Sequence, residues 1–141
     1  MENFTVEQVA WRDNLDKLRS IRTTVFVEEQ NVSLQEEWDG RDENAIHVLA
    51  LTEDRKPIGT ARLLDSGQIG RMAVLREYRR HGIGSAMLRL LLEIAKKNRV
   101  GNLFLNAQVE AIGFYSRYGF IEQGETFMEA GIAHRRMVLR A

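Results

Sequence analysis

The chain has 141 residues, of which 44% are hydrophobic and 28% are charged. This length and apolar content suit a single core, so we expect one domain over residues 1–141. The 20 basic and 20 acidic side chains cancel, so no overall field attracts nucleic acid or an anionic membrane, and we expect neither partner. The lack of cysteine excludes disulfides, thiolate chemistry and sulfur-ligated metals. No stretch resembles a signal peptide or reaches the roughly 20 apolar residues of a membrane span, which favours a cytoplasmic protein.

The first half of the chain predicts a strand, a helix and then a series of strands. Residues 4–11 show partial apolar alternation, which is typical of a strand. Asp13 is a candidate N-cap for a following helix whose apolar face runs from Leu15 to Val25. The polar segment 28–44 predicts a long surface loop or a broken helix. Three further strands are expected at residues 45–52, 57–64 and 68–74.

The second half contains the strongest secondary-structure signal, a helix that starts at Ile83. Apolar residues recur at positions 83, 86, 87, 90, 91, 94 and 95, which is the spacing of one helical face. Gly101 follows this helix and is expected to mark its exit. The remaining elements are expected as strands at 103–108, 120–127 and 133–140 and a short helix at 109–119. Many strands with one amphipathic helix between them imply a mixed α/β sheet.

The stretch RRHGIGSAM, residues 79–87, places basic residues before a glycine-rich turn. Its spacing fails the Walker loop, and Met87 stands where the dinucleotide fingerprint needs a third small residue. What remains is a strand, basic residues, Gly-x-Gly and a helix. The glycines allow close backbone approach, and the helix start offers unpaired N–H groups, so the turn suits a pyrophosphate. By spacing alone, a glycine turn beside solvated arginines fits equally well.

Several motifs in the same order resemble the GCN5-related N-acetyltransferase (GNAT) superfamily. Arg79, Gly82 and Gly84 occupy the three places of its Arg/Gln-x-x-Gly-x-Gly/Ala signature. GRMAVLREY resembles its fourth strand and FYSRYGF its late helix, while RTTVFVEEQ, NAIH, LNAQ and EAGIAHRRM are similar to the ElaA-like group of small bacterial acetyltransferases. The resemblance implies an α/β (α+β) fold, the GNAT fold, with a mixed, mostly antiparallel seven-stranded sheet. It also implies about four flanking helices and a splay between strands 4 and 5.

The resemblance implies acetyl-CoA as co-substrate, held where strands 4 and 5 part, and no metal. The strand containing Met72 would offer backbone groups to pantetheine, and the turn from Arg79 to Ser85 would wrap the pyrophosphate. Asn106 and Gln108 would face the cofactor, although mid-strand polar residues can equally be satisfied core groups. The candidate cofactor-binding residues are Met72, Ala73, Val74, Arg79, Arg80, His81, Gly82, Ile83, Gly84, Ser85, Asn106, Gln108, Tyr115 and Tyr118.

The implied reaction is the direct attack of a primary amine on the thioester in a ternary complex. Tyr115 matches the place of the superfamily's usual general acid, and Tyr118 could substitute for it, whereas a core aromatic is the alternative reading. A base must deprotonate the acceptor, and the candidates are Glu29, Glu129, His134 and His47. His134 is chemically the most convenient of them, because histidine titrates near neutrality without perturbation.

Other charged and polar residues are expected to have structural roles or to be solvated. His47 lies in an apolar strand and is expected to be a hydrogen-bonded core residue. Glu28, Glu36 and Glu37 are expected to be solvated, and Arg22 could pair with Glu29. The acidic segment 36–43 favours an amino-bearing, cationic acceptor, either a small molecule or an exposed protein amine, although such charge runs are commonly just solvated.

Two other functions stay open at this point. RTTVFVEEQ is also similar to the amino-terminal motif of acyl-homoserine lactone synthases, although this chain is short for them and has the glycine turn that they usually lack. A non-catalytic CoA-binding sensor on the same fold is the second alternative. The carboxy-terminal strand ending in MVLRA could also pair across a homodimer, as it does in many members of the superfamily.

Overall fold

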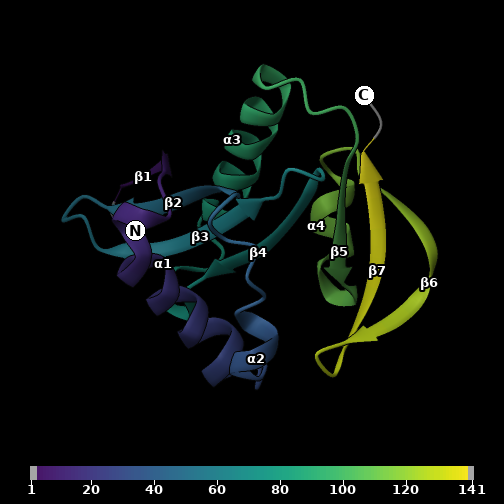
Figure 1. Ribbon diagram of the computed structural model, residues 1–141, viewed down its shortest axis with the longest axis horizontal. Helices are drawn as coiled ribbons and strands as arrows, with labels where there is room; N and C mark the ends of the chain where they lie inside the picture. The colour runs from purple at the N-terminus through teal and green to yellow at the C-terminus, as the bar shows by residue number, and fades with distance from the viewer. Residues whose placement is uncertain (1–2, 140–141) are drawn as a thin grey trace.

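Seven strands form one sheet of order β1-β2-β3-β4-β5-β7-β6 in the computed structural model, which describes residues 3–139 (Figure 1). The strands are β1 (Phe4–Val9), β2 (Ile46–Thr52), β3 (Pro57–Leu63), β4 (Gln68–Val74), β5 (Leu103–Gln108), β6 (Ile121–Glu129) and β7 (Ile132–Leu139). Every neighbouring pair is antiparallel except β4 and β5, which are parallel. The predicted mixed, mostly antiparallel sheet is therefore confirmed.

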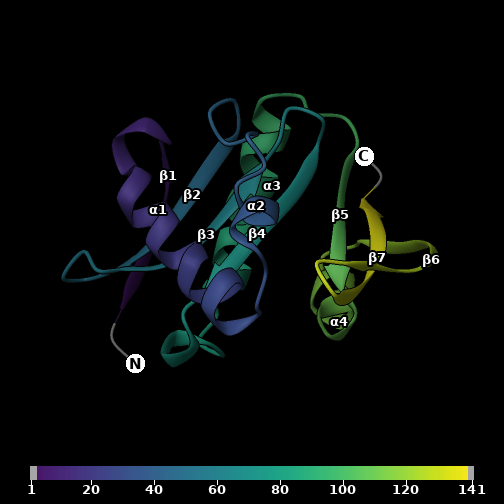
Figure 2. The same ribbon diagram turned by 60° about the horizontal axis from the view of Figure 1, so that its bottom comes forward.

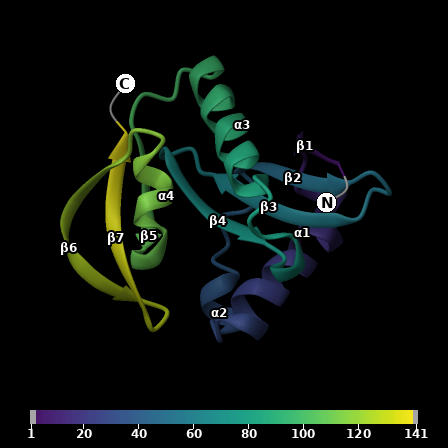
Figure 3. The ribbon, with the colours of Figure 1, turned by 180° about the vertical axis from the view of Figure 1, so that it is seen from behind.

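The α-helices cover both faces of this sheet. They are α1 (Leu15–Arg22), α2 (Leu34–Glu37), α3 (Ile83–Lys97) and α4 (Ile112–Ser116), and α1 continues directly into a π-helical segment, Thr23–Glu29. Figures 2 and 3 show α1 and α2 on one face, with α3 and α4 on the other. Within residues 3–139, no helix has both the length and the apolar character needed to cross a membrane.

Helix α3 is fixed against the middle of the sheet by its apolar face. Met87, Leu88 and Leu91 on this face are fully buried, and burial of such a side chain contributes roughly 1.5–3 kcal/mol. The helix lies so close to β3 that a Cβ atom on Gly59 would come within 3.2 Å of both Ala73 O and Ile83 Cγ2. Glycine at this position therefore lets the first turn of α3 lie directly on β3.

Strands β4 and β5 part almost as soon as they have paired. Only Gln68 with Phe104 and Ile69 with Leu105 are in register. A bulge follows in β4, where the register with β3 shifts and Arg71 adopts a left-handed φ of 50°. Because a bulge bends its strand, residues 71–74 of β4 diverge from the second half of β5. The predicted splay between strands 4 and 5 is confirmed.

Some local expectations were wrong. Asp13 does not cap α1, because it lies in a 3-10 turn and Asn14 precedes the helix without a side-chain cap bond. The left-handed residue after α3 is Arg99, with a φ of 57°, and not Gly101. Strand β7 lies between β5 and β6, so it has no free edge, and a dimer formed by strand pairing would need β1 or β6. Arg140, expected to end the last strand, and Ala141 lie outside the described residues.

Candidate functional site

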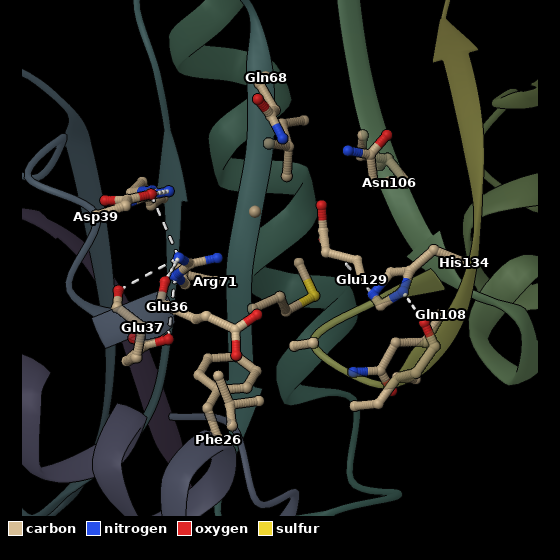
Figure 4. A pocket seen from close by; sticks show the side chains of 18 of the residues that line it. Phe26, Glu36, Glu37, Asp39, Gln68, Arg71, Asn106, Gln108, Glu129 and His134 are labelled. Atoms are coloured by element: carbon tan, nitrogen blue, oxygen red, sulfur yellow. Dashed lines mark hydrogen bonds and ion pairs between the residues drawn. The ribbon is translucent and has the colours of Figure 1, made fainter. Parts of the chain in front are cut away.

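A cavity of about 570 Å³ lies where β4 and β5 diverge (Figure 4). The π-helical segment and α2 supply one wall, and β5, β7 and the end of β6 supply the opposite wall, with β4 between them. Segments that are distant in the sequence therefore meet around one space. The residues predicted for the site that line this cavity are Met72, Asn106, Gln108, Tyr115, Glu129 and His134.

His134 presents one ring nitrogen to the cavity region in a form that can accept a proton. Its Nδ1 lies 2.7 Å from the carbonyl oxygen of Ile132, and because a carbonyl can only accept, Nδ1 must carry the hydrogen. In the neutral ring this leaves the lone pair on Nε2, which lies 3.8 Å from Glu129 Oε2. The imidazole also stacks on Phe127 at a centroid distance of 5.9 Å. The hydrogen bond to Ile132 and this stacking together fix the orientation of the ring.

Tyr115 lies at the boundary between the cavity and the core. Its ring packs edge-on against Phe114 and Phe120, and its hydroxyl lies 3.7 Å from Met72 Sδ. Burial raises the pKa of Tyr115 to about 12, so the phenol stays protonated at neutral pH. Tyr118 packs against Phe114 at a centroid distance of 5.7 Å and does not line the cavity.

The start of α3 has the backbone geometry of an anion site. Gly82 precedes the helix in the left-handed region, with a φ of 82°, where a side chain would be strained. The first N–H that bonds within the helix is that of Ala86, which donates to Gly82 O at 3.0 Å. The N–H groups of Ile83, Gly84 and Ser85 therefore precede the helix's own bonding and lie at its positive end. Arg80 and His81 are exposed beside them.

The side chain of Arg79 is engaged within the protein. It forms two hydrogen bonds of 2.7 Å with the carboxylate of Glu29, and its Nε donates to Val74 O at 2.9 Å. The hydrogen bonds from Arg79 lower the pKa of Glu29, which does not line the cavity. Glu29 is therefore an ion-pair partner with little basicity, and the expected pairing of Arg22 with Glu29 is wrong.

The backbone of β4 offers one donor to the open wedge. Leu75 N–H donates toward β3, to Ile58 O at 2.9 Å. Because consecutive amides of a strand point to opposite edges, Val74 N–H faces the edge that β5 has left. Ala73 lies opposite Thr60 and is buried, so its side chain belongs to the core. On the far side of the wedge, Gln108 donates to Gln30 Oε1 at 3.0 Å.

An ion-pair cluster that sequence reasoning missed builds the wall opposite His134. It consists of three arginines and three acids, Arg22, Arg62, Arg71, Glu37, Asp39 and Asp42. Arg22 bonds Glu37 and also Asp42, at 2.7 Å, and its guanidinium lies between the rings of Trp11 and Trp38. Arg62 bonds Asp39 at 2.8 Å and Asp42 at 3.0 Å.

This cluster corrects one expectation and confirms others. Glu37 is 1% exposed, so its prediction as a solvated charge is wrong, whereas Glu28 and Glu36 are exposed as expected. His47 is buried and hydrogen-bonded to Asp42 O at 2.9 Å, as expected for a core histidine. The sequence feature that could have indicated a buried ion pair is Arg62, which lies within an apolar strand. An arginine in such a place is almost never buried without a partner.

Comparisons with known proteins extend over nearly the whole chain. A family model described as an acetyltransferase (GNAT) domain matches residues 4–141. The Bacillus subtilis protein YyaT is 33% identical over 137 residues, covering 93% of this chain and 92% of YyaT. The crystal structure of Escherichia coli ElaA is 28% identical, with a TM-score of 0.86 over 96% of this chain and 99% of that one. That of an acyl-CoA N-acyltransferase from Pseudomonas aeruginosa is 29% identical, with a TM-score of 0.87 over 97% and 99%.

The ion-pair cluster predicts a specific acid sensitivity through Asp39. Burial acts to raise the pKa of Asp39, but its hydrogen bonds to Arg62 outweigh this and lower it from 3.8 to about 2. The stability it contributes is therefore complete above about pH 5 and is lost as the pH falls from about 4 to about 2. After allowance for solvent screening, we expect Asp39→Asn to lower the free energy of unfolding by about 1 kcal/mol at pH 6 and by about half as much at pH 3.

Urea unfolding at both pH values measures this difference. Asp54→Asn, in the exposed turn between β2 and β3, controls for the loss of one carboxylate. A destabilisation by Asp39→Asn that is the same at pH 3 and pH 6 would contradict the role of Asp39 in the cluster.

Proposed function

The chain belongs to the GNAT acetyltransferase family, and the resemblance to ElaA is confirmed, since E. coli ElaA is 30% identical over 125 residues. On this premise we propose that it transfers the acetyl group of acetyl-CoA to a primary amine by direct attack within a ternary complex. The observation that carries the proposal is the wedge between β4 and β5. It joins the free amides at the start of α3 to a cavity lined by Tyr115, Glu129 and His134.

The residues at the wedge suit the two ends of a CoA molecule. The N–H groups of Ile83, Gly84 and Ser85 would bind the pyrophosphate, with Arg80 and His81 adding positive charge beside them. The guanidinium of Arg79 is paired with Glu29, so Arg79 would contribute to CoA binding through its backbone. Its Nε would also help to position Val74, to whose carbonyl oxygen it donates. When bound, acetyl-CoA supplies an activated thioester. Val74 N–H is the donor available to its oxygen as negative charge develops there.

His134 is the base that the geometry favours. Its Nε2 carries the lone pair, and Glu129 lies 3.8 Å away, where it would attract an ammonium group. Glu29 is the least suitable of the predicted bases, because both of its oxygens bond Arg79. Neutral amine for the attack would therefore form at the His134 side of the cavity.

Tyr115 would stabilise the leaving thiolate by hydrogen bonding. A thiol has an ordinary pKa of about 8.5, well below the value of about 12 to which burial raises the pKa of Tyr115. Full transfer of the phenolic proton to sulfur is thus unfavourable, whereas an O–H bond directed at the sulfur is favourable. We therefore assign Tyr115 the role of a hydrogen-bond donor to the leaving group.

The convergence of these groups favours an enzyme over a CoA-binding sensor. A sensor needs the pyrophosphate turn but has no use for Tyr115, Glu129 and His134 around one cavity. The glycine turn with its free helix amides also favours acetyl-CoA chemistry over a lactone synthase, since those enzymes usually lack it.

Binding of acetyl-CoA at the start of α3 can be tested with Ser85→Glu. A glutamate at the third helical position supports the helix start, so the fold should persist, but its carboxylate would occupy the amides and repel a pyrophosphate. Acetyl-CoA at 100 times its Kd should stabilise the wild-type protein and Ser85→Ala by about 2.7 kcal/mol, a rise of several degrees in Tm. Ser85→Glu should show no rise. An undiminished Tm shift in Ser85→Glu would count against the site.

Removal of the Tyr115 hydroxyl should affect turnover and not cofactor affinity. Tyr115→Phe keeps the ring packing with Phe114 and Phe120 but loses the donor. We expect kcat for thiol release to fall about 10- to 100-fold, while the Kd for acetyl-CoA, measured by calorimetry, changes less than about threefold. An unchanged kcat would remove Tyr115 from the reaction.

Substitution of the proposed base should change the shape of the pH–rate profile. The rate of an enzyme with a histidine base rises with pH as the imidazole loses its proton, and glutamine at that position cannot titrate. His134→Gln should lower kcat at neutral pH by about 10²- to 10⁴-fold and flatten the acid limb. A profile parallel to that of the wild-type enzyme would assign the base elsewhere.

A further inference from the structure

We propose that the acceptor is a small amine that also carries a carboxylate, as an α-amino acid does, and that Arg71 binds this carboxylate. The proposal rests on the proposed acetyl transfer and names its substrate class. It replaces the cationic acceptor that the acidic segment 36–43 suggested, because the structure changes the account of those charges.

Arg71 directs one unsatisfied donor into the cavity. Its Nε lies 3.1 Å from Glu37 Oε2, and its Nη2 bonds Glu36 O and Glu37 O at 3.0 and 3.2 Å. Nη2 also lies 3.3 Å from Asp39 Oδ2. Among residues 3–139, Nη1 has no hydrogen-bond partner, and Figure 4 shows this side of the guanidinium facing the open centre of the cavity. A charged donor in this setting suits an anionic group.

The bulge in β4 sets the direction of the Arg71 side chain. Arg71 has a φ of 50° at the bulge of β4, a conformation that costs a non-glycine residue of order 1–3 kcal/mol. The bulge places the side chain on the wall between β4 and α2, where its Nε forms an ion pair with Glu37 that lacks the geometry of a hydrogen bond. The surrounding groups therefore hold the guanidinium through Nε and Nη2 and leave its Nη1 edge open to the cavity.

Three of the five acids of segment 36–43 are paired with arginines, whereas Glu36 and Glu43 are exposed. Glu37 and Asp42 are buried against Arg22, and Asp39 is paired with Arg62. They therefore give little attraction to a cationic acceptor. Burial acts to lower the pKa of Arg62, but its bonds to Asp39 and Asp42 outweigh this and raise it, whereas burial lowers the pKa of Arg71 despite Glu37 nearby. Among residues 3–139, Arg22 and Arg62 use both Nη atoms in hydrogen bonds, whereas Arg71 uses only Nη2.

The opposite wall has the complementary charge. Glu129 is half-exposed, and Figure 4 shows its carboxylate reaching into the cavity from the His134 side, across from Arg71. An ammonium group would lie at Glu129, within reach of the proposed base, while a carboxylate on the same molecule would lie at Arg71. A cavity of about 570 Å³ is of the size that holds a small molecule. A lysine side chain of a protein offers the ammonium but no nearby carboxylate.

The test compares matched acceptors that differ only in the carboxylate. The twenty common α-amino acids are screened with acetyl-CoA for thiol release, and each substrate is then compared with its primary amide and its decarboxylated amine. We expect the acid to exceed the amide in kcat/KM by at least about tenfold, the size of one charge-assisted hydrogen bond. Amides or decarboxylated amines that react as well as the acids would overturn the proposal.

Arg71→Gln tests the residue itself. We expect it to bring the acid-to-amide ratio of kcat/KM close to one, because the acid loses its charged partner and the amide has none to lose. Lys97→Gln, which removes the same charge at the far end of α3, should keep the wild-type ratio. An equal fall for acid and amide in Arg71→Gln would mean that Arg71 is only structural. The comparison of each acid with its amide in the wild-type enzyme tests the proposal even if Arg71→Gln does not fold.

Calorimetry separates failure of this inference from failure of the proposed function. Each acid and its amide are titrated into wild-type protein saturated with CoA, which requires no turnover. Binding of the acid at least about tenfold tighter than the amide supports the carboxylate site even if no acetyl transfer occurs. Equal binding of the pair, or no binding of either, overturns it, whatever the thiol-release assay gives for other amines.

Discussion

The parting of β4 and β5 after two residue pairs is the constraint on which the rest of the site depends. In a continuous sheet, Val74 N–H would donate a hydrogen bond to the neighbouring strand, and no side chain could enter between the strands. The bulge at Arg71 removes that pairing and turns a side chain into the opening. The same divergence leaves the first turn of α3 at one end of the wedge and the cavity at the other.

The second requirement is a wall that faces β7, and buried charges supply it. In the described part of the chain, the polypeptide between the π-helical segment and β2 has α2 as its one regular element, and three arginines join it to α1, β3 and β4. Taking six charged groups out of water is expensive, and their mutual attraction offsets the expense only because nearly every oxygen and nitrogen finds a partner. Among residues 3–139, Arg62 Nε and Arg71 Nε are buried without a hydrogen bond, and Arg71 Nη1, which also lacks one, faces the cavity.

The features that could be predicted from the sequence are those encoded by local spacing. The periodicity from Ile83 gave α3, and the Gly-x-Gly turn gave the free amides beside it. The motif order gave the sheet, including its splay, since it identified a family. The cluster could not be predicted, because Arg22 pairs with Glu37 and Asp42, which are 15 and 20 residues away, and no helical or strand period relates them. For the same reason Glu29 was expected beside Arg22, although its partner Arg79 lies 50 residues on.

The buried cluster also limits how this chain can change. Loss of a fully buried member, such as Arg22 or Glu37, leaves an opposite charge stranded in the core, which costs about 3–5 kcal/mol, whereas joint replacement of a pair by well-packed apolar residues can be neutral. Substitutions in Arg22, Glu37, Asp42 and Arg62 are therefore expected to be tolerated in combination and not singly. A designer who wishes to reshape the acceptor wall would have to treat these residues as one unit. Glu129, half-exposed on the opposite wall, can be altered alone.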